Sequence, residues 1–460
     1  MLRLVAAQAE TLWDEALPIE VRELPADLAA LDVLLADPAL LAPFSAQWQR
    51  EALQSGVSAA GHGRPTIAIE TYVRLMVLKQ RYGWGYRTLV AEVSDSIHLR
   101  RFCRIALSEL VCDESTVRKL TRRVGEETVN EIIRALISSA VREQRFRGRA
   151  VRIDSTVIEA DIKYPTDAGL AAQGVKSLAR EGRKLARTIG QAGAGVRDRG
   201  RSMGRRLRTI TRTIRRRSGE AKAEVLNLTG QTGELLTRSV REARRLAATA
   251  RRKARGRGAQ AKLRAAARLE ELADRCEKVA EQIVKRVRGE KITDRLISLS
   301  DPDARPIRKG KLGKPTEFGY VAQLAEVTPN TKRGARGLVL PAASLPGNPG
   351  ENTLLPQTVT ELQRLGLSPK EIALDGGFNV GPTTDALEDL APERVFIAGR
   401  QQPGSRRTQR RLQRYRTGAE GRISHLKRGY GLRRSRLKGD EVTGWAILTY
   451  NLDTLTIRSA

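Results

Sequence analysis

Cysteine and histidine are scarce in this chain, and their scarcity limits the metal sites that it can build. The 460 residues include three cysteines and three histidines. Cys103, Cys112 and Cys276 lie far apart, a spacing typical of neither a disulfide framework nor a zinc site. Any metal is therefore expected to have oxygen ligands, as Mg2+ and Mn2+ do. The low cysteine content also fits a reducing, cytoplasmic compartment.

Long apolar runs are also missing. No run reaches the roughly 18 residues that a membrane-spanning helix needs. The first residues, Met1–Ala7, soon give way to acidic residues, so we expect no secretory signal peptide. These absences predict a chain with no membrane partner.

Basic residues, by contrast, are abundant. Lys and Arg number 83 against 52 Asp and Glu, which gives a formal charge of +31 and a pI near 10.8. Such a charge indicates a polyanionic partner, most often nucleic acid, with a membrane surface as the weaker alternative. The length, with 40% hydrophobic residues, is enough for two or three domains with their own cores.

The first third of the chain is predicted to be all-α. Residues 1–60 are expected to be helical in pieces, and residues 61–147 to form a compact helical domain. Within it the pattern predicts helices capped by Thr66, over about 86–95, and from Asp113 onward. Its arginines, Arg87 and Arg118 among them, either contact DNA in a helix-turn-helix-like manner or simply face water. The sequence leaves these two interpretations equal.

Residues 170–290 are rich in Arg and Ala, with apolar residues at helical spacing. They predict a basic helical hairpin or coiled coil, inserted into the domain that follows. One face would pack and the other would carry positive charge, for nucleic acid or for a second protomer.

The flanking segments alternate between strand and helix patterns. The predicted strands are 149–162, Arg295–Leu299, Phe318–Val327, Gly337–Leu340, Glu371–Asp375 and Arg394–Ala398. The predicted helices are about 351–365, 382–390, 411–428 and 441–457. This order is typical of an RNase H-like domain, with a three-stranded meander followed by alternating helices and parallel strands. The fold class is thus an α/β RNase H-like domain, residues 148–169 and 291–460, with a large helical insertion and an all-α N-terminal domain.

Three acids fall on these elements in a suggestive way. Asp154 interrupts an apolar strand, where an unpaired carboxylate is costly; a turn or a capping role is the plainer interpretation. Asp375 ends a short buried strand before a tight turn of small residues. Glu420 is the lone acid of a basic helix, and either pairs with Arg416 or binds metal. In an RNase H-like sheet the three would meet and require divalent cations.

These residues also carry a family resemblance. Arg416, Glu420 and Lys427 match the Arg-x3-Glu-x6-Lys helix of DDE transposases from bacterial insertion sequences. The tyrosine expected three residues before the arginine is Gln413 here, although Tyr415 lies close. Asp154–Ala160, followed by Tyr164–Asp167, is similar to the first-acid segment of ISNCY-like members, and Leu374–Phe378 resembles their second-acid segment. The stretch Tyr86–Phe102 resembles their N-terminal helical domain. The similar region covers about residues 60–460, least securely in the insertion.

The resemblance implies a reaction and its participants. A DDE transposase binds the terminal inverted repeats of its element, cleaves a phosphodiester to expose a 3′-hydroxyl and joins that end to target DNA. Asp154, Asp375 and Glu420 would hold two Mg2+ ions, with Mn2+ as the alternative. The basic residues expected to contact DNA are Arg416, Lys427, Arg422, Arg428, Arg87 and Arg118. Double-stranded DNA, a homodimer or higher oligomer on that DNA, and a bacterial, nucleoid-associated location are implied as well.

Two other functions stay open at this point. One is a transposase-derived DNA-binding protein that has lost catalysis. The other is an RNase H-like nuclease that cleaves without strand transfer. His425 is expected to be an incidental packing or groove-side residue.

Overall fold

The computed structural model describes residues 2–6, 16–55, 66–191, 193, 195–256, 258–308, 316–345, 347, 349–401, 403–435 and 442–459. The chain divides into two compact units. Unit 1 contains Met1–Glu159 and Tyr320–Ala460, and unit 2 contains Ala160–Gly319. The protein is mixed α/β.

Helices form the N-terminal part of unit 1. They are α2 (Ile19–Arg22), α3 (Ala26–Leu35), η1 (Pro38–Leu40), α4 (Ala42–Ser55), α5 (Ile69–Arg81), α6 (Tyr86–Asp95), α7 (Ile97–Phe102) and α8 (Glu114–Arg142). α8 begins where predicted, because the Asp113 side chain accepts a hydrogen bond from the Ser115 amide at 2.7 Å. Thr66 does not cap α5, which starts after Ala68; its hydroxyl accepts a hydrogen bond from the Arg3 amide instead.

These helices share one hydrophobic core with the sheet. Buried residues of α3, α5 and α8 belong to the same cluster as Val151 and Ile153 of the first strand and Trp445 near the C-terminus. The sequence analysis had divided this region at residue 147 into two domains. The structure instead groups both parts in unit 1, because the apolar faces of the helices pack on the sheet and its covering helices.

The sheet of unit 1 is mixed. Its strands are β1 (Ala150–Ala160), β3 (Glu317–Thr328), β4 (Leu338–Val339), β5 (Ala343–Leu345), β6 (Glu371–Leu374), β7 (Arg394–Ile397) and β8 (Arg434–Ser435). The order is β3-β1-β6-β7, with β4 and β5 antiparallel to β3 and β8 beside β1. β1, β6 and β7 are parallel. The predicted neighbours, the first strand and the strand that carries the second acid, are therefore adjacent.

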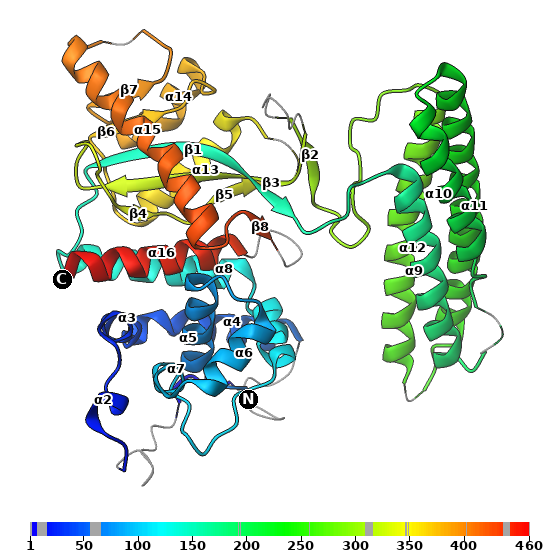
Figure 1. Ribbon diagram of the computed structural model, residues 1–460, viewed down its shortest axis with the longest axis horizontal. Coiled ribbons are helices and arrows are strands. Elements are labelled where there is room, and N and C mark those ends of the chain that lie inside the picture. Colours follow the sequence, from blue (N-terminus) through cyan, green and yellow to red (C-terminus); the bar gives the residue numbers. More distant parts are fainter. Residues whose placement is uncertain are drawn as a thin grey trace. The chain divides into compact units, whose positions relative to one another are not determined.

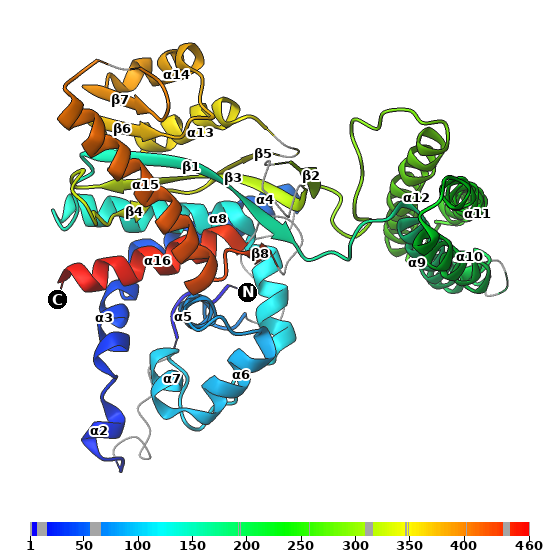
Figure 2. The same ribbon diagram turned by 45° about the horizontal axis from the view of Figure 1, so that its top comes forward.

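Besides the 3-10 turn η3 (Glu388–Leu390), four α-helices of the described residues complete unit 1 (Figures 1 and 2). They are α13 (Glu351–Arg364), α14 (Val380–Leu387), α15 (Arg406–Gly429) and α16 (Val442–Ser459). α15 crosses β6 and β7, whereas α16 contacts α8, α5 and β4. Trp445, Leu448 and Leu452 of α16 are fully buried, so this helix joins the sheet to the N-terminal helices.

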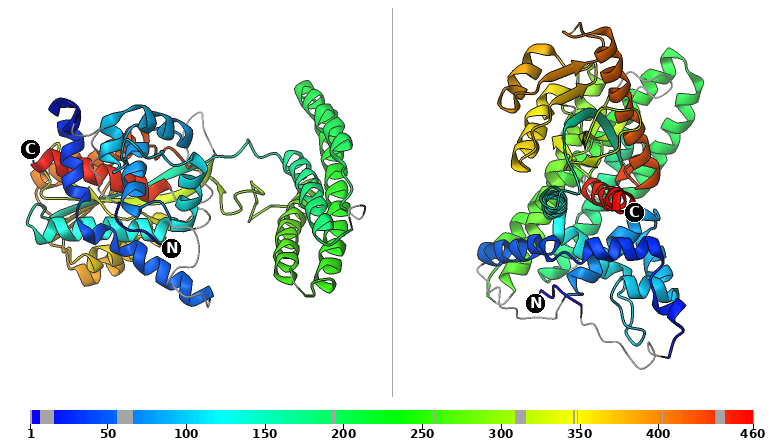
Figure 3. Two further views of the ribbon diagram at one scale, coloured as in Figure 1. Left: turned by 90° about the horizontal axis from the view of Figure 1, so that it is seen from below. Right: turned by 90° about the vertical axis from the view of Figure 1, so that its left-hand side faces the viewer.

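Unit 2 is a helical bundle, whereas the insertion pattern predicted a helical hairpin or coiled coil. α9 (Asp167–Thr188), α10 (Gly200–Thr213), α11 (Gly219–Arg252) and α12 (Ala259–Val287) lie side by side with nearly parallel axes (Figure 3). Close approaches occur at Gly174 and Gly233, where an added Cβ would lie 2.8 Å from Leu236 and 2.9 Å from Ile283 respectively. Leu178, Leu236 and Leu269 belong to a core made only of unit 2 residues.

The predicted strand Arg295–Leu299 was wrong. The segment has no strand pairing; β2 (Arg305–Ile307) instead pairs with the first residues of β3. Leu296 and Leu299 are buried in the bundle core. The Gln282 side chain satisfies the Leu296 backbone, accepting from its amide at 2.5 Å and donating to its carbonyl at 3.1 Å. A side-chain amide therefore replaces the strand partner that the apolar pattern had predicted.

Among the helices that the structure describes, no single one has both the length and the hydropathy of a membrane span. The bent pair Ala26–Leu35 and Pro38–Leu53 meets those criteria only when its two helices are combined.

Candidate metal centre

The strand register brings the first two predicted acids together. In the parallel pair β1–β6, Ile153 is opposite Leu374. Asp154 and Asp375 follow these residues directly, so they lie side by side where the pairing of β1 with β6 stops, with Asp154 inside β1 and Asp375 just after β6. Asp154 is 8% exposed, and its Oδ1 accepts a hydrogen bond from the Ser155 amide at 2.7 Å. It lies within β1 and caps no helix, which removes the plainer interpretation of this residue.

The third member of the acidic group is Glu351, which the sequence analysis missed. Carboxylate oxygens of Asp154, Glu351 and Asp375 all lie within 4.8 Å of one another. Glu351 is the first residue of α13, following the N-cap Gly350. Acidic residues are common in the first turn of a helix because they complement the helix dipole. An acid at this position therefore gave no sign of a metal site in the sequence. Only the structure shows that the first residue of α13 lies beside Asp375, which follows β6.

Neighbouring side chains hold Glu351 in place. Gln323 on β3 is fully buried and donates from Nε2 to the Glu351 carbonyl at 2.9 Å. The Asn352 side chain accepts from the Asn379 amide at 2.9 Å and donates to the Thr383 hydroxyl at 3.0 Å. These contacts join the start of α13 both to the sheet and to the segment after Asp375.

Gly377 makes the approach of Glu351 possible. An added Cβ at this position would overlap the carboxylate of Glu351. The small residues after Asp375 were predicted to admit a ligand close to the backbone, and the group that approaches there is this side chain.

The acidic group fits a hard divalent cation. Three carboxylates this close repel one another, and one of them, Asp154, is buried. Oxygens bound to one Mg2+ at about 2.1 Å lie at most about 4.2 Å apart, so a small contraction of the group suffices. The described residues contain no second group of three or more such acids. The expectation of two ions therefore stays a prediction.

Glu420 lies outside this group and is linked to it by Arg416. Arg416 donates from Nη1 to Asp375 Oδ1 at 2.5 Å and from Nη2 to Glu420 Oε1 at 2.6 Å. The pairing of Glu420 with Arg416, which the sequence analysis kept as the plainer interpretation, is therefore present. The Arg416 side chain is 11% exposed and the Glu420 side chain 58% exposed. Arg416, predicted to bind DNA, is here a partly buried cation between two carboxylates.

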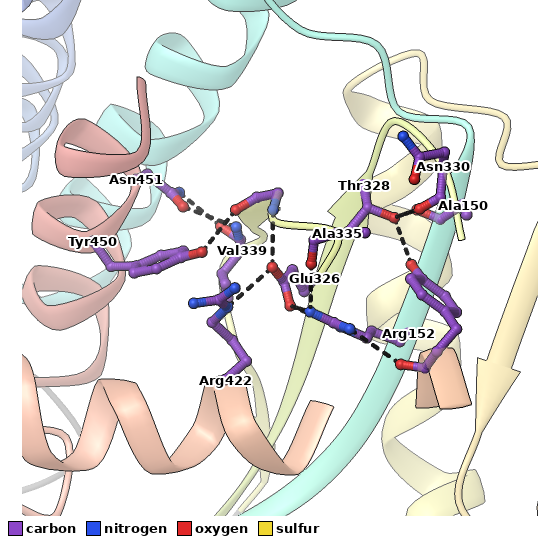
Figure 4. Close-up of polar contacts among 12 residues, drawn as sticks. Ala150, Arg152, Glu326, Thr328, Asn330, Ala335, Val339, Arg422, Tyr450 and Asn451 are labelled. Carbon is purple, nitrogen blue, oxygen red and sulfur yellow. Dashed lines mark hydrogen bonds and ion pairs between the residues drawn. The ribbon is translucent and has the colours of Figure 1, made fainter. Parts of the chain in front are cut away.

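A buried ion-pair network fixes the helix that carries Arg416 and Glu420 (Figure 4). Glu326 on β3 accepts from Arg152 at 2.8 and 2.6 Å through Oε2. Its other oxygen accepts from Arg422 at 3.0 Å and from the Gly337 amide at 2.9 Å. Arg152 also donates to the Tyr415 carbonyl at 3.1 Å. The network thus joins β1, β3 and α15, and it engages Arg422, which had been predicted to contact DNA.

The other predicted DNA contacts have varied positions. Lys427 donates to the Val157 carbonyl of β1 at 2.8 Å. Arg428 is exposed and donates a hydrogen bond from Nη2 to the Ser424 hydroxyl at 2.6 Å. Arg87 on α6 is exposed, and Arg118 on α8 lies 3.9 Å from Glu114. DNA contact by these four residues stays a prediction.

Two other titratable side chains lie on α15. His425 lies edge-on to Tyr430 and Tyr450, and burial together with Arg422 and Arg336 lowers its pKa. Burial raises the pKa of Tyr415, whose hydroxyl contacts Thr328 at 2.7 Å. Tyr415 is thus a buried packing residue, whereas His425 is exposed, and its expected packing or groove-side role stays a prediction.

The three cysteine thiols are free. Burial raises the pKa of Cys112 to about 11 and that of Cys276 to about 12, and it also raises the pKa of Cys103. The thiols are therefore protonated at neutral pH, which disfavours reactivity.

Comparisons with known proteins point to the transposases. Residues 36–123, which include most of the N-terminal helices and none of the acidic group, match the family described as "Transposase domain (DUF772)". An uncharacterized protein, ORF8 in the nfe locus of Rhizobium meliloti, is 26% identical over 127 residues. The aligned part is 26% of this chain and spans 61% of that protein. No solved structure matches. The family match supports a transposase relationship for the chain.

Proposed function

We propose that the protein is a DDE-type transposase whose metal ligands are Asp154, Asp375 and Glu351. The observation that carries the proposal is the meeting of three carboxylates where the parallel pairing of β1 with β6 stops. The transposase-domain match on the N-terminal helices supports the same reaction class. The strand order, with the first strand parallel to β6 and antiparallel strands beyond β3, is the basis for proposing an RNase H-like fold.

The chain's own residues have distinct tasks in this proposal. Asp154, Asp375 and Glu351 would hold Mg2+ or Mn2+ at the end of the sheet. When bound, such a cation activates the attacking water or 3′-hydroxyl and stabilises the leaving oxygen of the phosphodiester. Gln323 orients Glu351 by donating a hydrogen bond to its backbone carbonyl. Asn352, the next residue, fixes the start of the helix through its hydrogen bond from the Asn379 amide. Arg416 holds Asp375 and keeps Glu420 beside the group.

Metal-dependent cleavage and joining of DNA that carries the sequences flanking the gene tests the proposal. Wild type is compared with Asp154→Asn, Asp375→Asn, Glu351→Gln and Glu420→Gln. The first three variants should cleave about 100-fold more slowly or worse. Mutation of a residue that only hydrogen-bonds to a metal ligand already lowers activity or metal affinity by about 10–100-fold. Glu420→Gln should lose less, because Glu420 reaches the group only through Arg416. DNA binding should survive in all four.

Each contrary outcome points to a different function. Full cleavage by Glu351→Gln with loss in Glu420→Gln would restore the triad expected from sequence. Cleavage without joining by the wild type would indicate a nuclease. Binding without any chemistry would indicate a transposase-derived DNA-binding protein.

A further inference from the structure

The helix α10 of unit 2 and the short turn that follows it carry a single row of arginines. Arg201, Arg205, Arg208, Arg212 and Arg215 are all exposed along α10 and the 3-10 turn η2 (Ile214–Arg216). Successive members are four, three, four and three residues apart, so all five project from one face of the helix. At 1.5 Å per residue the row is about 20 Å long. We call these five residues the arginine row.

The charge of the arginine row is not neutralised within the described structure. Residues 199–219 contain no Asp or Glu. No side chain of the row has an ion-pair or hydrogen-bond partner among the residues that the structure describes. Some arginines of α11 differ, because acids of α12 face them. Arg244 pairs with Asp274 and Glu277, and Arg251 pairs with Glu270.

The opposite face of α10 holds the row rigidly on the bundle. Met203 is fully buried there, with Leu207 and Ile210 half-buried at helical spacing. Arg206 donates to the Gln231 side chain of α11 at 3.0 Å. Arg199, just before α10, pairs with Glu242 of α11 and donates to Ser239 at 3.1 Å. The five cations are therefore displayed from a packed helix and not from a loose tail.

We propose that the arginine row binds the phosphate backbone of duplex DNA. Duplex DNA carries one negative charge about every 1.7 Å of its axis, so a 20 Å row faces on the order of ten phosphate charges. The residues that flank the row most closely around the helix are small, Ser202, Gly204, Thr209 and Thr211, which lets a backbone approach closely. A protein partner would be expected to meet aromatic or apolar anchors, and this face has none among its described residues.

This inference rests on the proposed function only for the identity of the polyanion as duplex DNA. It assigns nucleic acid, and not a second protomer, as the partner of the inserted helices. Phosphate contacts fix position and supply affinity but do not specify sequence. The row is thus expected to strengthen binding to any duplex equally, whether it carries the element's ends or not.

The salt dependence of DNA binding by the full chain tests the arginine row. The triple variant Arg205→Gln, Arg208→Gln, Arg212→Gln removes three cations from it. The matched control, Arg244→Gln, Arg251→Gln, Arg275→Gln, removes three cations that already face acids. Each lost phosphate contact should lower the slope of log Kobs against log salt by about 0.9, so the row variant should lose about 2 to 3 in slope. The control should change the slope by less than about 1.

Several results would overturn the inference. They are an unchanged slope in the row variant, an equal loss in both variants, or a loss seen only with anionic vesicles or an acidic polypeptide. Arg205→Lys, Arg208→Lys, Arg212→Lys should keep the wild-type slope, because it keeps the charges.

Failure of the proposed function would appear elsewhere. Asp154→Asn should lose cleavage and keep the slope. If the wild type does not cleave DNA, but the row variant still has a smaller slope of log Kobs against log salt, the proposed reaction is wrong and DNA binding by the arginine row is supported.

Discussion

Gly377 has no side chain beyond a hydrogen atom, and this lets the Glu351 carboxylate lie close to Asp154 and Asp375. Gly377→Ala would place a Cβ where the Glu351 carboxylate lies, so the carboxylate must move. We expect about 10–100-fold weaker Mn2+ binding by calorimetry, with a similar loss of cleavage.

The matched control for this prediction is Gly421→Ala on α15. An added Cβ there meets no atom within 4 Å, so Mn2+ binding should not change. Equal metal affinity in Gly377→Ala and wild type would show that Glu351 is not a ligand.

Glu371 gives the protein a predictable response to acid. Burial alone would raise the pKa of this carboxyl, but its hydrogen bonds to Arg411 and Thr331 and the nearby Arg394 lower the pKa below the ordinary 4.5. The folded state therefore favours the ionised form. Its contribution to the free energy of unfolding is present above about pH 4.5 and is lost as the pH falls through the lowered value.

The variant Glu371→Gln checks this response. At pH 7 we expect it to be less stable than wild type by about 1.5–3 kcal/mol, the usual range for a hydrogen bond to a charged group. In urea unfolding the difference should narrow as the pH is lowered below 4.5. A difference that stays constant from pH 7 to pH 3 would contradict the assignment.

At the scale of elements, the Glu326 network decides where α15 lies. Glu326→Gln would leave Arg152 and Arg422 buried without a countercharge, and we expect a loss of about 3–5 kcal/mol in the free energy of unfolding. Cleavage should fall as well, because α15 carries Arg416 and Glu420. Chemical denaturation and the cleavage assay measure the two effects.

Arg422→Gln is the informative comparison. Glu326 would keep Arg152 and the Gly337 amide, so the expected loss is only about 1–2 kcal/mol. If this variant instead lost DNA affinity with no loss of stability, Arg422 would be the DNA contact that its sequence position predicted.

At the scale of the whole molecule, the two units have separate cores. The bundle core includes no residue of unit 1, and the larger core includes none of unit 2. We therefore expect two unfolding transitions by calorimetry. Gly233→Ala should lower only the transition of unit 2, because the added Cβ lies 2.9 Å from Ile283 and overpacking costs about 1–3 kcal/mol.

Gly230→Ala on the same helix should have the opposite effect. Its Cβ would meet Val287 at an ordinary 3.5 Å, and alanine favours a helix over glycine by about 1 kcal/mol. A single transition shifted by both variants would show that the units unfold together.

Much of the sheet could be predicted from the sequence because β-branched residues at Val151, Ile153 and Val157 favour a strand wherever it packs. The neighbours Asp154 and Asp375 followed from the expected strand order. Glu351 could not be found in this way, since its role depends on where α13 starts in space. The Arg295–Leu299 segment was misassigned because a burial pattern does not reveal that a side chain, Gln282, bonds the backbone. Both errors arose because contacts between residues distant in the sequence determine these two features.

The inserted bundle has a consequence for synthesis on the ribosome. β1 ends at Ala160, but its sheet neighbour β3 begins only at Glu317, 157 residues later, and β6 later still. At about 5–20 residues per second, translation needs roughly 8 to 30 s to deliver that first neighbour. During this time the apolar strand emerges with its edges unpaired, while α9 to α12 form from local contacts. Translation speed through the bundle is therefore expected to set how long the nascent strand is open to aggregation.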